Sequence, residues 1–242
     1  MKATERWQSE RVGTEFNLVR WGTLGTPVLI FPTAGGDCEE IERFHLIDAL
    51  GPLLGAGRIK VYSVDSLNGR AFLTGADSRH ASWLMTAFDD AIYHEVVPAI
   101  RQDCRSDSIE VITAGASIGA FNALEVLCRH PDVFRAALCV SGTFDLTRWM
   151  RGPITNDFYF SSPLHYLPTL ADGPQLDWLR RRLVLLTHGQ GRAEEPGESW
   201  RVAEVLGRRL IPNRVEEWGP EWPHDWITWR EMFPIYLDQL TS

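Results

Sequence analysis

The feature that most restricts the fold is a tight turn between a buried strand and a helix. Residues 110–114 form a short, apolar, β-branched run, which is typical of a buried strand. A helix is predicted over residues 120–129 and ends before Pro131, because proline cannot continue a helix. Between strand and helix stands the pentapeptide Gly115-Ala116-Ser117-Ile118-Gly119, a G-x-S-x-G pattern.

A turn this sharp forces its serine into a strained backbone conformation. Glycines on either side, which lack a Cβ atom, allow strand and helix to approach closely. In this context the pattern is typical of a nucleophile elbow, with the Ser117 hydroxyl exposed at the carboxyl edge of the sheet beside the positive end of a helix. Short motifs often match by chance, so the pentapeptide alone does not exclude a turn without chemistry.

Apolar runs alternate with helical patterns along most of the chain. Strands are expected at residues 27–32, 59–64, 110–114, 136–142, 183–188 and 214–218, and helices at 39–50, 82–102, 120–129, 199–208 and 225–240. Pro98 is expected to kink or break the second helix. Residues 6–11 and 15–21 predict an antiparallel hairpin at the sheet edge.

This order of elements predicts one α/β domain over residues 1–242, with a mostly parallel central sheet and helices on both faces. Residues 143–177, after the strand at 136–142, are irregular and rich in proline and aromatic side chains. We expect this small insertion to fold over the pocket.

Composition and charge exclude several function classes. The formal net charge of -8 argues against a nucleic-acid partner, whose phosphates would be repelled. No apolar run is long enough to span a bilayer, and residues 1–10 lack the apolar segment of a secretory signal. The 4 cysteines are scattered without a C-x-x-C pair, which fits free thiols in a reducing cytoplasm, the compartment we expect.

A serine hydroxyl needs a base to take its proton, and His224 is the best placed of the 7 histidines. It lies between the last predicted strand and the final helix, at the same carboxyl edge as the elbow, and Asp225 can cap that helix. His188, at the end of a strand, is the competitor and is expected to line the pocket at most. No H-x-x-x-H, H-x-H or Cys/His cluster occurs, so we expect neither a metal nor another cofactor.

The imidazole in turn needs a carboxylate that holds its tautomer and stabilises the imidazolium. In the chain order nucleophile, acid, base, the acid usually follows the strand before last, where Glu194 and Glu195 stand. We prefer Glu194, with Glu195 second and Asp145, after the preceding strand, third. A solvated surface charge is the more common role for any single one of them.

The oxyanion of an acyl-transfer reaction is bound by backbone amides, of which one belongs to the residue after the nucleophile, Ile118. The second is expected from the glycine-rich loop 33–36, with Ala34 as first choice and Gly35 next. Each such donor is typically worth about 10²–10³ in turnover. Substrate contacts are expected from Gly35 and from three aromatic side chains, because 10 tryptophans suggest an aromatic-walled pocket: Trp149, Tyr159 and Trp222.

With these parts in place, the chain resembles the putative-esterase branch of the α/β-hydrolases. That branch includes esterase D (S-formylglutathione hydrolase), feruloyl esterases, polyhydroxybutyrate-depolymerase-like enzymes and mycolyltransferases. The resemblance covers nearly the whole chain and is carried by residues 28–37, 95–98, 115–120, 141–142, 188–191 and 222–226.

The resemblance implies an α/β-hydrolase fold with Ser117 as nucleophile, His224 as base and an acid after Gly191. It also implies an oxyanion hole from the amides of Ile118 and of the loop 33–36. The chain departs from the usual family pattern in one respect, since glutamate and not aspartate stands in the acid loop.

The sequence thus predicts a cytoplasmic serine carboxylesterase that hydrolyses a small-molecule ester through an acyl-enzyme on Ser117, without nucleic-acid or membrane partners. Within enzymes, acyl transfer or thioester cleavage by the same triad is the alternative. Outside enzymes, the alternative is a catalytically silent binding protein of the same fold. Acyl and alcohol specificity stay open, as does the oligomeric state, including a homo-oligomer.

Overall fold

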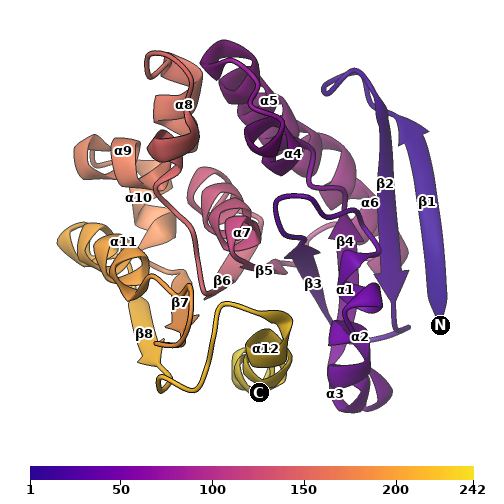
Figure 1. Cartoon of the computed structure of the whole chain (residues 1–242). Coiled ribbons are helices and arrows are strands. Elements are labelled where there is room, and N and C mark those ends of the chain that lie inside the picture. The colour runs from indigo at the N-terminus through magenta and orange to yellow at the C-terminus, as the bar shows by residue number, and fades with distance from the viewer.

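A single eight-stranded sheet runs through the computed structural model, which describes all residues Met1–Ser242 (Figure 1). Its strands are β1 (Lys2–Gln8), β2 (Glu15–Trp21), β3 (Thr26–Phe31), β4 (Ile59–Val64), β5 (Val111–Ala116), β6 (Phe134–Val140), β7 (Leu183–His188) and β8 (Asn213–Glu217). Their order is β1-β2-β4-β3-β5-β6-β7-β8. Neighbouring strands from β4 across the sheet to β8 pair in parallel, whereas β2 pairs antiparallel with both β4 and β1. The hairpin of β1 and β2 was predicted, but its first strand covers Lys2–Gln8 and not residues 6–11.

Helices cover both faces of this sheet, as predicted. One face carries α1 (Glu40–Arg43), α2 (Leu46–Ala49), α3 (Gly51–Gly55) and α12 (Trp226–Leu240), whose apolar side chains share one buried cluster. The other face carries α4 (Leu67–Leu73), α5 (Ser78–Ala91), α6 (Val97–Cys104), α7 (Ile118–Arg129), α8 (Asn156–Ser161), α9 (Pro163–Tyr166), α10 (Pro174–Leu179) and α11 (Pro196–Arg208). Helix α4 was not predicted.

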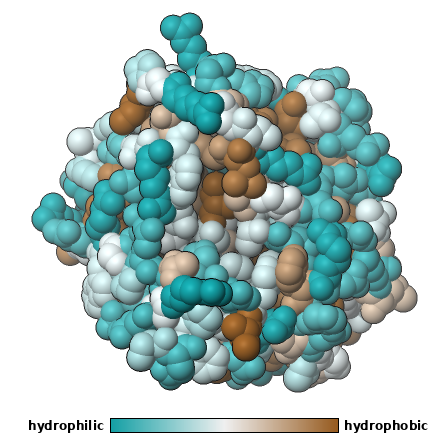
Figure 2. All heavy atoms as spheres, in the orientation of Figure 1, coloured by the Kyte–Doolittle hydropathy of each residue, from teal (hydrophilic) through white to brown (hydrophobic).

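The surface is mostly hydrophilic, with apolar side chains exposed in small groups, several of them near the middle of the face in Figure 2. None of the helices combines the length and the apolar character needed to cross a membrane. All 4 cysteines are free, and Cys104 alone is not fully buried.

Two predicted helices differ from the observed ones. The helix expected over residues 39–50 is broken at His45, whose φ of 62° is left-handed and separates α1 from α2. The second helix begins earlier, at Ser78, because the Asp77 side chain caps its first amides. Pro98 does not end this helix: α5 continues through a π-helical turn over Ile92–Val96 into α6, so a local change of helical winding stands where a kink or break was expected.

The insertion after β6 forms a 3-10 turn at Leu146–Trp149, then α8, α9, a second 3-10 turn at Leu167–Thr169 and α10. Helix α8 contacts α5, and α9 contacts α7 and α11. Beyond Trp149 the insertion therefore packs beside the pocket described below and not over it, because Phe158 and Tyr166 are buried in the core of that helical layer.

Candidate active site

The turn between β5 and α7 has the strained geometry that the sequence predicts. Ser117 has a φ of 56° and a ψ of -124°, a conformation that a side-chain-bearing residue rarely adopts. A Cβ atom on Gly115 would lie 2.2 Å from the carbonyl carbon of Gly119, and one on Gly119 would lie 2.4 Å from the carbonyl oxygen of Phe31. Only glycine fits at either position, so both glycines are needed to form the turn.

A cavity of about 260 Å³ opens over this turn, at the carboxyl edge of the sheet. Ser117 and His224 both line it, although they are more than 100 residues apart in the chain. Ile118 and Ala34, the expected oxyanion donors, line the same cavity, and so does Trp149. With Glu195, the second candidate acid, six residues singled out from the sequence therefore share one pocket.

His224 lies beside a buried carboxylate. Its Nδ1 atom is 3.7 Å from Oε2 of Glu194, whose side chain is only 1% exposed. The other oxygen of Glu194 accepts a hydrogen bond of 2.6 Å from the Ser141 hydroxyl. A carboxylate buried in this way needs polar partners, which distinguishes Glu194 from a solvated surface charge. At 3.7 Å this contact is longer than a hydrogen bond, as is common for catalytic pairs without bound substrate.

The two alternative acids have other partners. Glu195 lies on the pocket wall, where both of its oxygens are within 2.9 Å of Nη1 of Arg148. Asp145 caps the 3-10 turn after it and accepts a bond of 3.1 Å from Arg201. Partial burial raises the pKa of Asp145, but hydrogen bonds from Thr147 and Arg201 outweigh it and hold this pKa below its usual value. The geometry thus favours Glu194 over both.

The loops that carry Glu194 and His224 are joined along their backbones. The amide of Gly191 donates to the carbonyl of Trp222 at 2.9 Å, and the amide of His224 donates to the carbonyl of Arg192 at 3.0 Å. A Cβ on Gly189 would lie 2.0 Å from that same Trp222 carbonyl oxygen, so glycine is required for the loops to meet. Just beyond, Asp225 caps α12 as predicted and so fixes the end of the histidine loop.

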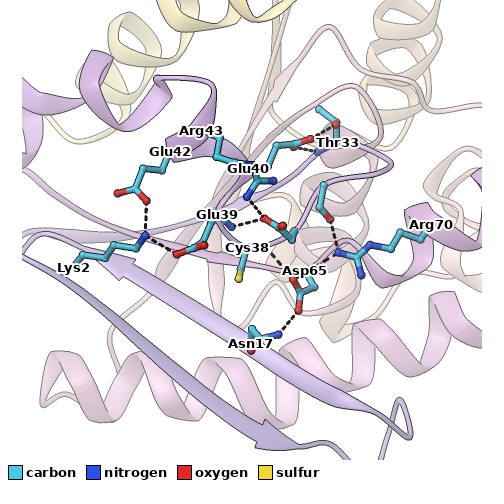
Figure 3. A network of polar contacts seen from close by, with 12 residues as sticks. Lys2, Asn17, Thr33, Cys38, Glu39, Glu40, Glu42, Arg43, Asp65 and Arg70 are labelled. Atoms are coloured by element: carbon cyan, nitrogen blue, oxygen red, sulfur yellow. Dashed lines mark hydrogen bonds and ion pairs between the residues drawn. The ribbon is translucent and has the colours of Figure 1, made fainter.

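The expected oxyanion loop is fixed at its first residue, Thr33, by the buried carboxylate of Glu40 (Figure 3). Glu40 accepts bonds of 2.7 Å from both the amide and the hydroxyl of Thr33. At the other end of the loop, Arg70 donates to the carbonyl of Gly36 at 3.2 Å. These contacts fix the backbone on both sides of Ala34 and Gly35.

The amides in this region are free to bind a ligand. Those of Ala34 and Gly35 donate to no acceptor in the protein. Ile118 is the first residue of α7, where amides have no acceptor within the helix and the helix dipole favours negative charge. Such an arrangement can stabilise an oxyanion that forms beside Ser117.

Four residues expected in or near the pocket lie elsewhere. Tyr159 lines a separate cavity of about 590 Å³ next to Arg129 and His130, because α8 stands beside the pocket. The Trp222 ring packs against Trp218, with centroids 4.7 Å apart, and only its backbone serves the site. His188 is 1% exposed and its Nδ1 is 2.9 Å from the Gly189 carbonyl oxygen, so it is a core residue. Gly35 belongs to the loop but does not line the cavity.

Other pocket residues were not found from the sequence. Phe72 and Leu73 reach the cavity from the unpredicted helix α4, and the apolar run 71–73 is the only signal for them. Arg148 also lines the cavity, with its guanidinium 4.2 Å from the centroid of the Trp149 ring. The pocket therefore has apolar walls and one ion pair, Arg148 with Glu195, at its side.

Comparisons with known proteins bear on this site. A family model described as "Putative esterase" matches residues 74–237, more than half of the chain. No curated protein matches the sequence. A structure described as ferulic acid esterase has a TM-score of 0.77 at 16% identity and covers 100% of this chain and 98% of its own.

Two further structures are similar over their whole length. S-formylglutathione hydrolase from Agrobacterium tumefaciens has a TM-score of 0.75 at 13% identity, over 100% of this chain and 94% of its own. The fluorophosphonate-binding serine hydrolase FphF from Staphylococcus aureus has a TM-score of 0.71 at 15% identity, over 100% and 98%. At these identities the likeness shows the fold, and the predicted fold class is confirmed.

Proposed function

The chain belongs to the putative esterase family of serine hydrolases, and from this we propose that it is a carboxylesterase with Ser117, His224 and Glu194 as its catalytic triad. One observation carries the proposal: a strained serine and a histidine line one cavity, and a buried glutamate lies 3.7 Å behind that histidine. A histidine beside a carboxylate is the kind of base that activates a serine hydroxyl for acyl transfer.

In the proposed mechanism, Oγ of Ser117 attacks the ester carbonyl while His224 takes its proton. The amides of Ile118 and Ala34 bind the oxyanion, and Glu194 stabilises the imidazolium. His224 then protonates the leaving alcohol, which leaves an acyl-enzyme. Water, deprotonated by His224, hydrolyses that intermediate and releases the acid. None of these steps uses a metal or an organic cofactor.

Hydrolysis is favoured over transfer to another alcohol by the position of the insertion. Only its first residues, as far as Trp149, reach the cavity, and the rest packs beside it, so water is not excluded by a cap. The proposed partner is a small-molecule ester. The 4 free cysteines support a reducing compartment such as the cytoplasm.

The proposal is tested by treating the wild-type protein with a fluorophosphonate and locating the adduct by peptide mass spectrometry. We expect one adduct, on Ser117, together with hydrolysis of p-nitrophenyl esters in a panel from acetate to decanoate. Repeating the assay with a competing alcohol measures transfer directly. No adduct and no turnover across the panel would show a binding protein, and a dominant transesterified product would show a transferase.

The assignment of the acid predicts different outcomes for two adjacent residues. Glu194→Gln is expected to lower kcat by about 10²–10⁴, because a neutral amide neither stabilises the imidazolium nor holds its tautomer. Glu195→Gln breaks only the exposed ion pair with Arg148 and is expected to change kcat by less than about threefold. Steady-state kinetics on a p-nitrophenyl ester measure both, and the reverse order of effects would assign the acid to Glu195.

The small cavity predicts a preference for short acyl groups, limited by the ring of Trp149. Trp149→Ala is expected to raise kcat/KM for the decanoate ester relative to the acetate ester by about tenfold or more, since each buried methylene contributes about 0.8 kcal/mol. Competition between the two esters measures this ratio. Trp178→Ala, an exposed tryptophan outside the pocket, is the control, and an equal change there would contradict the assignment.

A further inference from the structure

The residue that follows strand β6 has an unusual backbone. Ser141 has a φ of 45°, a left-handed conformation in a residue that is not glycine. Its amide donates to the carbonyl of Thr187 at 2.7 Å, and two residues later the amide of Thr143 donates to the carbonyl of Ser117 at 3.1 Å. Strained residues of this kind persist where the surrounding structure holds them, and they are frequent at active sites.

The buried hydroxyl of Ser141 joins an indole to the triad carboxylate. It accepts a hydrogen bond of 3.0 Å from Nε1 of Trp229 and lies 2.6 Å from Oε1 of Glu194. An indole N–H can only donate, and an ionised carboxylate can only accept. The single proton of the hydroxyl must therefore point at Glu194. Trp229 thus donates to Ser141, and Ser141 donates to Glu194.

Trp229 also contacts the proposed base directly. Its ring meets the His224 ring edge to face, with centroids 5.1 Å apart and planes at 85°. Trp229 is buried on α12, the helix that begins directly after the histidine loop. The Trp229 side chain thus restrains the His224 imidazole by packing against it and restrains the Glu194 carboxylate through its bond to Ser141.

A glutamate acid has more need of such an anchor than an aspartate. Its side chain has one more rotatable bond, so holding the carboxylate in one orientation costs more conformational entropy. Fixing Oε1 with the Ser141 hydroxyl leaves Oε2 directed at Nδ1 of His224.

We propose that Ser141 and Trp229 are positioning residues of the catalytic triad: they hold one oxygen of Glu194 so that the other faces His224. This inference rests on the proposed function. Neither residue lines the cavity, so they act on the substrate only through the triad.

The test uses variants that remove the bonds without disturbing the backbone. Ser141→Gly removes the hydroxyl and suits a left-handed residue, and Trp229→Phe keeps an aromatic ring but loses the N–H. Ser141→Gly is expected to lower kcat by about 10- to 100-fold, the usual range for a lost hydrogen bond to a charged group. Trp229→Phe loses a bond to a neutral hydroxyl and is expected to lower kcat by about 2- to 10-fold, with KM within about twofold for both variants. Ser63→Ala, whose buried hydroxyl has no partner, and Trp218→Phe, whose N–H bonds Tyr236 instead, are controls expected to keep wild-type kcat.

A double-mutant cycle separates positioning from a general structural role. In a Glu194→Ala background, Ser141→Gly is expected to lower kcat by less than about twofold further, because no carboxylate remains to be oriented. The inference would be overturned if Ser141→Gly lowered kcat in the Glu194→Ala background by the same factor as in the wild type. It would also be overturned if Ser141→Gly alone kept wild-type kcat. If Ser141→Gly fails to fold, Trp229→Phe is taken through the same cycle. A wild-type protein that neither turns over esters nor reacts with a fluorophosphonate would overturn the proposed function itself, a result distinct from these.

Discussion

Replacing Ser117 with alanine is expected to lower kcat/KM on p-nitrophenyl esters by at least about 10³-fold and to abolish fluorophosphonate labelling. The reason is chemical, because no other hydroxyl is held at the elbow beside the proposed oxyanion amides. Without Oγ no acyl-enzyme can form, and only general binding and the oxyanion donors remain to assist water. The fold should be kept, since alanine differs from serine by a single oxygen, on a residue that lines the cavity and not the core.

The measurement is a comparison of initial rates and of gel fluorescence after labelling with a fluorescent fluorophosphonate. Circular dichroism and thermal unfolding of both proteins show whether the variant is folded. Ser63→Ala serves as the matched control, because it removes a buried hydroxyl in β4 away from the pocket. Labelling that survives in Ser117→Ala would place the nucleophile elsewhere.

Gly115→Ala is expected to lower the free energy of unfolding by at least about 3 kcal/mol, a loss large enough that little folded protein is recovered. The added methyl group would lie 2.2 Å from both the carbonyl carbon and the carbonyl oxygen of Gly119. These are backbone atoms at the start of α7, which cannot rotate away as a side chain would. Strand and helix must separate, and Ser117 then loses its position in the pocket.

Alanine at Gly207 is expected to change the free energy of unfolding in the opposite direction. This glycine lies exposed near the end of α11, and a Cβ there would meet nothing within 4 Å. Gly207→Ala is expected to stabilise the protein by about 0.5–1 kcal/mol, because alanine loses less backbone entropy in a helix. Urea unfolding, monitored by circular dichroism, measures the stability of both variants and of the wild type. Equal midpoints for Gly115→Ala and the wild type would contradict the steric argument.

The strands could be predicted well because buried parallel strands are continuous apolar runs. The strands at Ile59–Val64 and Leu183–His188 begin and end where the pattern does. Helix α4 was missed because it has only seven residues and its apolar ones, apart from Leu67, are the consecutive run 71–73, which shows no helical period. Tertiary packing decides whether such short helices form, and by missing α4 the sequence analysis also missed two residues of the pocket wall, Phe72 and Leu73.

The choice between Glu194 and Glu195 shows a different limit of sequence reasoning. The two residues are adjacent and chemically identical, and no pattern separates them. What separates them is the left-handed Ala193, with a φ of 64°, followed by one side chain that turns toward Ser141 and a second that turns toward Arg148. The direction of each glutamate side chain is set by a partner that is distant in the sequence, Ser141 or Arg148. Only the three-dimensional structure shows which partner each glutamate contacts.

The backbone bonds between the Glu194 and His224 loops have a consequence for how specificity can change. The acid and the base lie on two hydrogen-bonded loops that follow β7 and β8, whereas the large apolar side chains of the wall, Phe72, Leu73 and Trp149, come from α4 and from the turn Leu146–Trp149. Substitutions in those walls leave the proton-transfer machinery untouched. Variant libraries confined to Leu73 and Trp149 should therefore yield enzymes with new acyl preferences and an unchanged turnover step. Because separate segments carry specificity and proton transfer, each can be redesigned without the other.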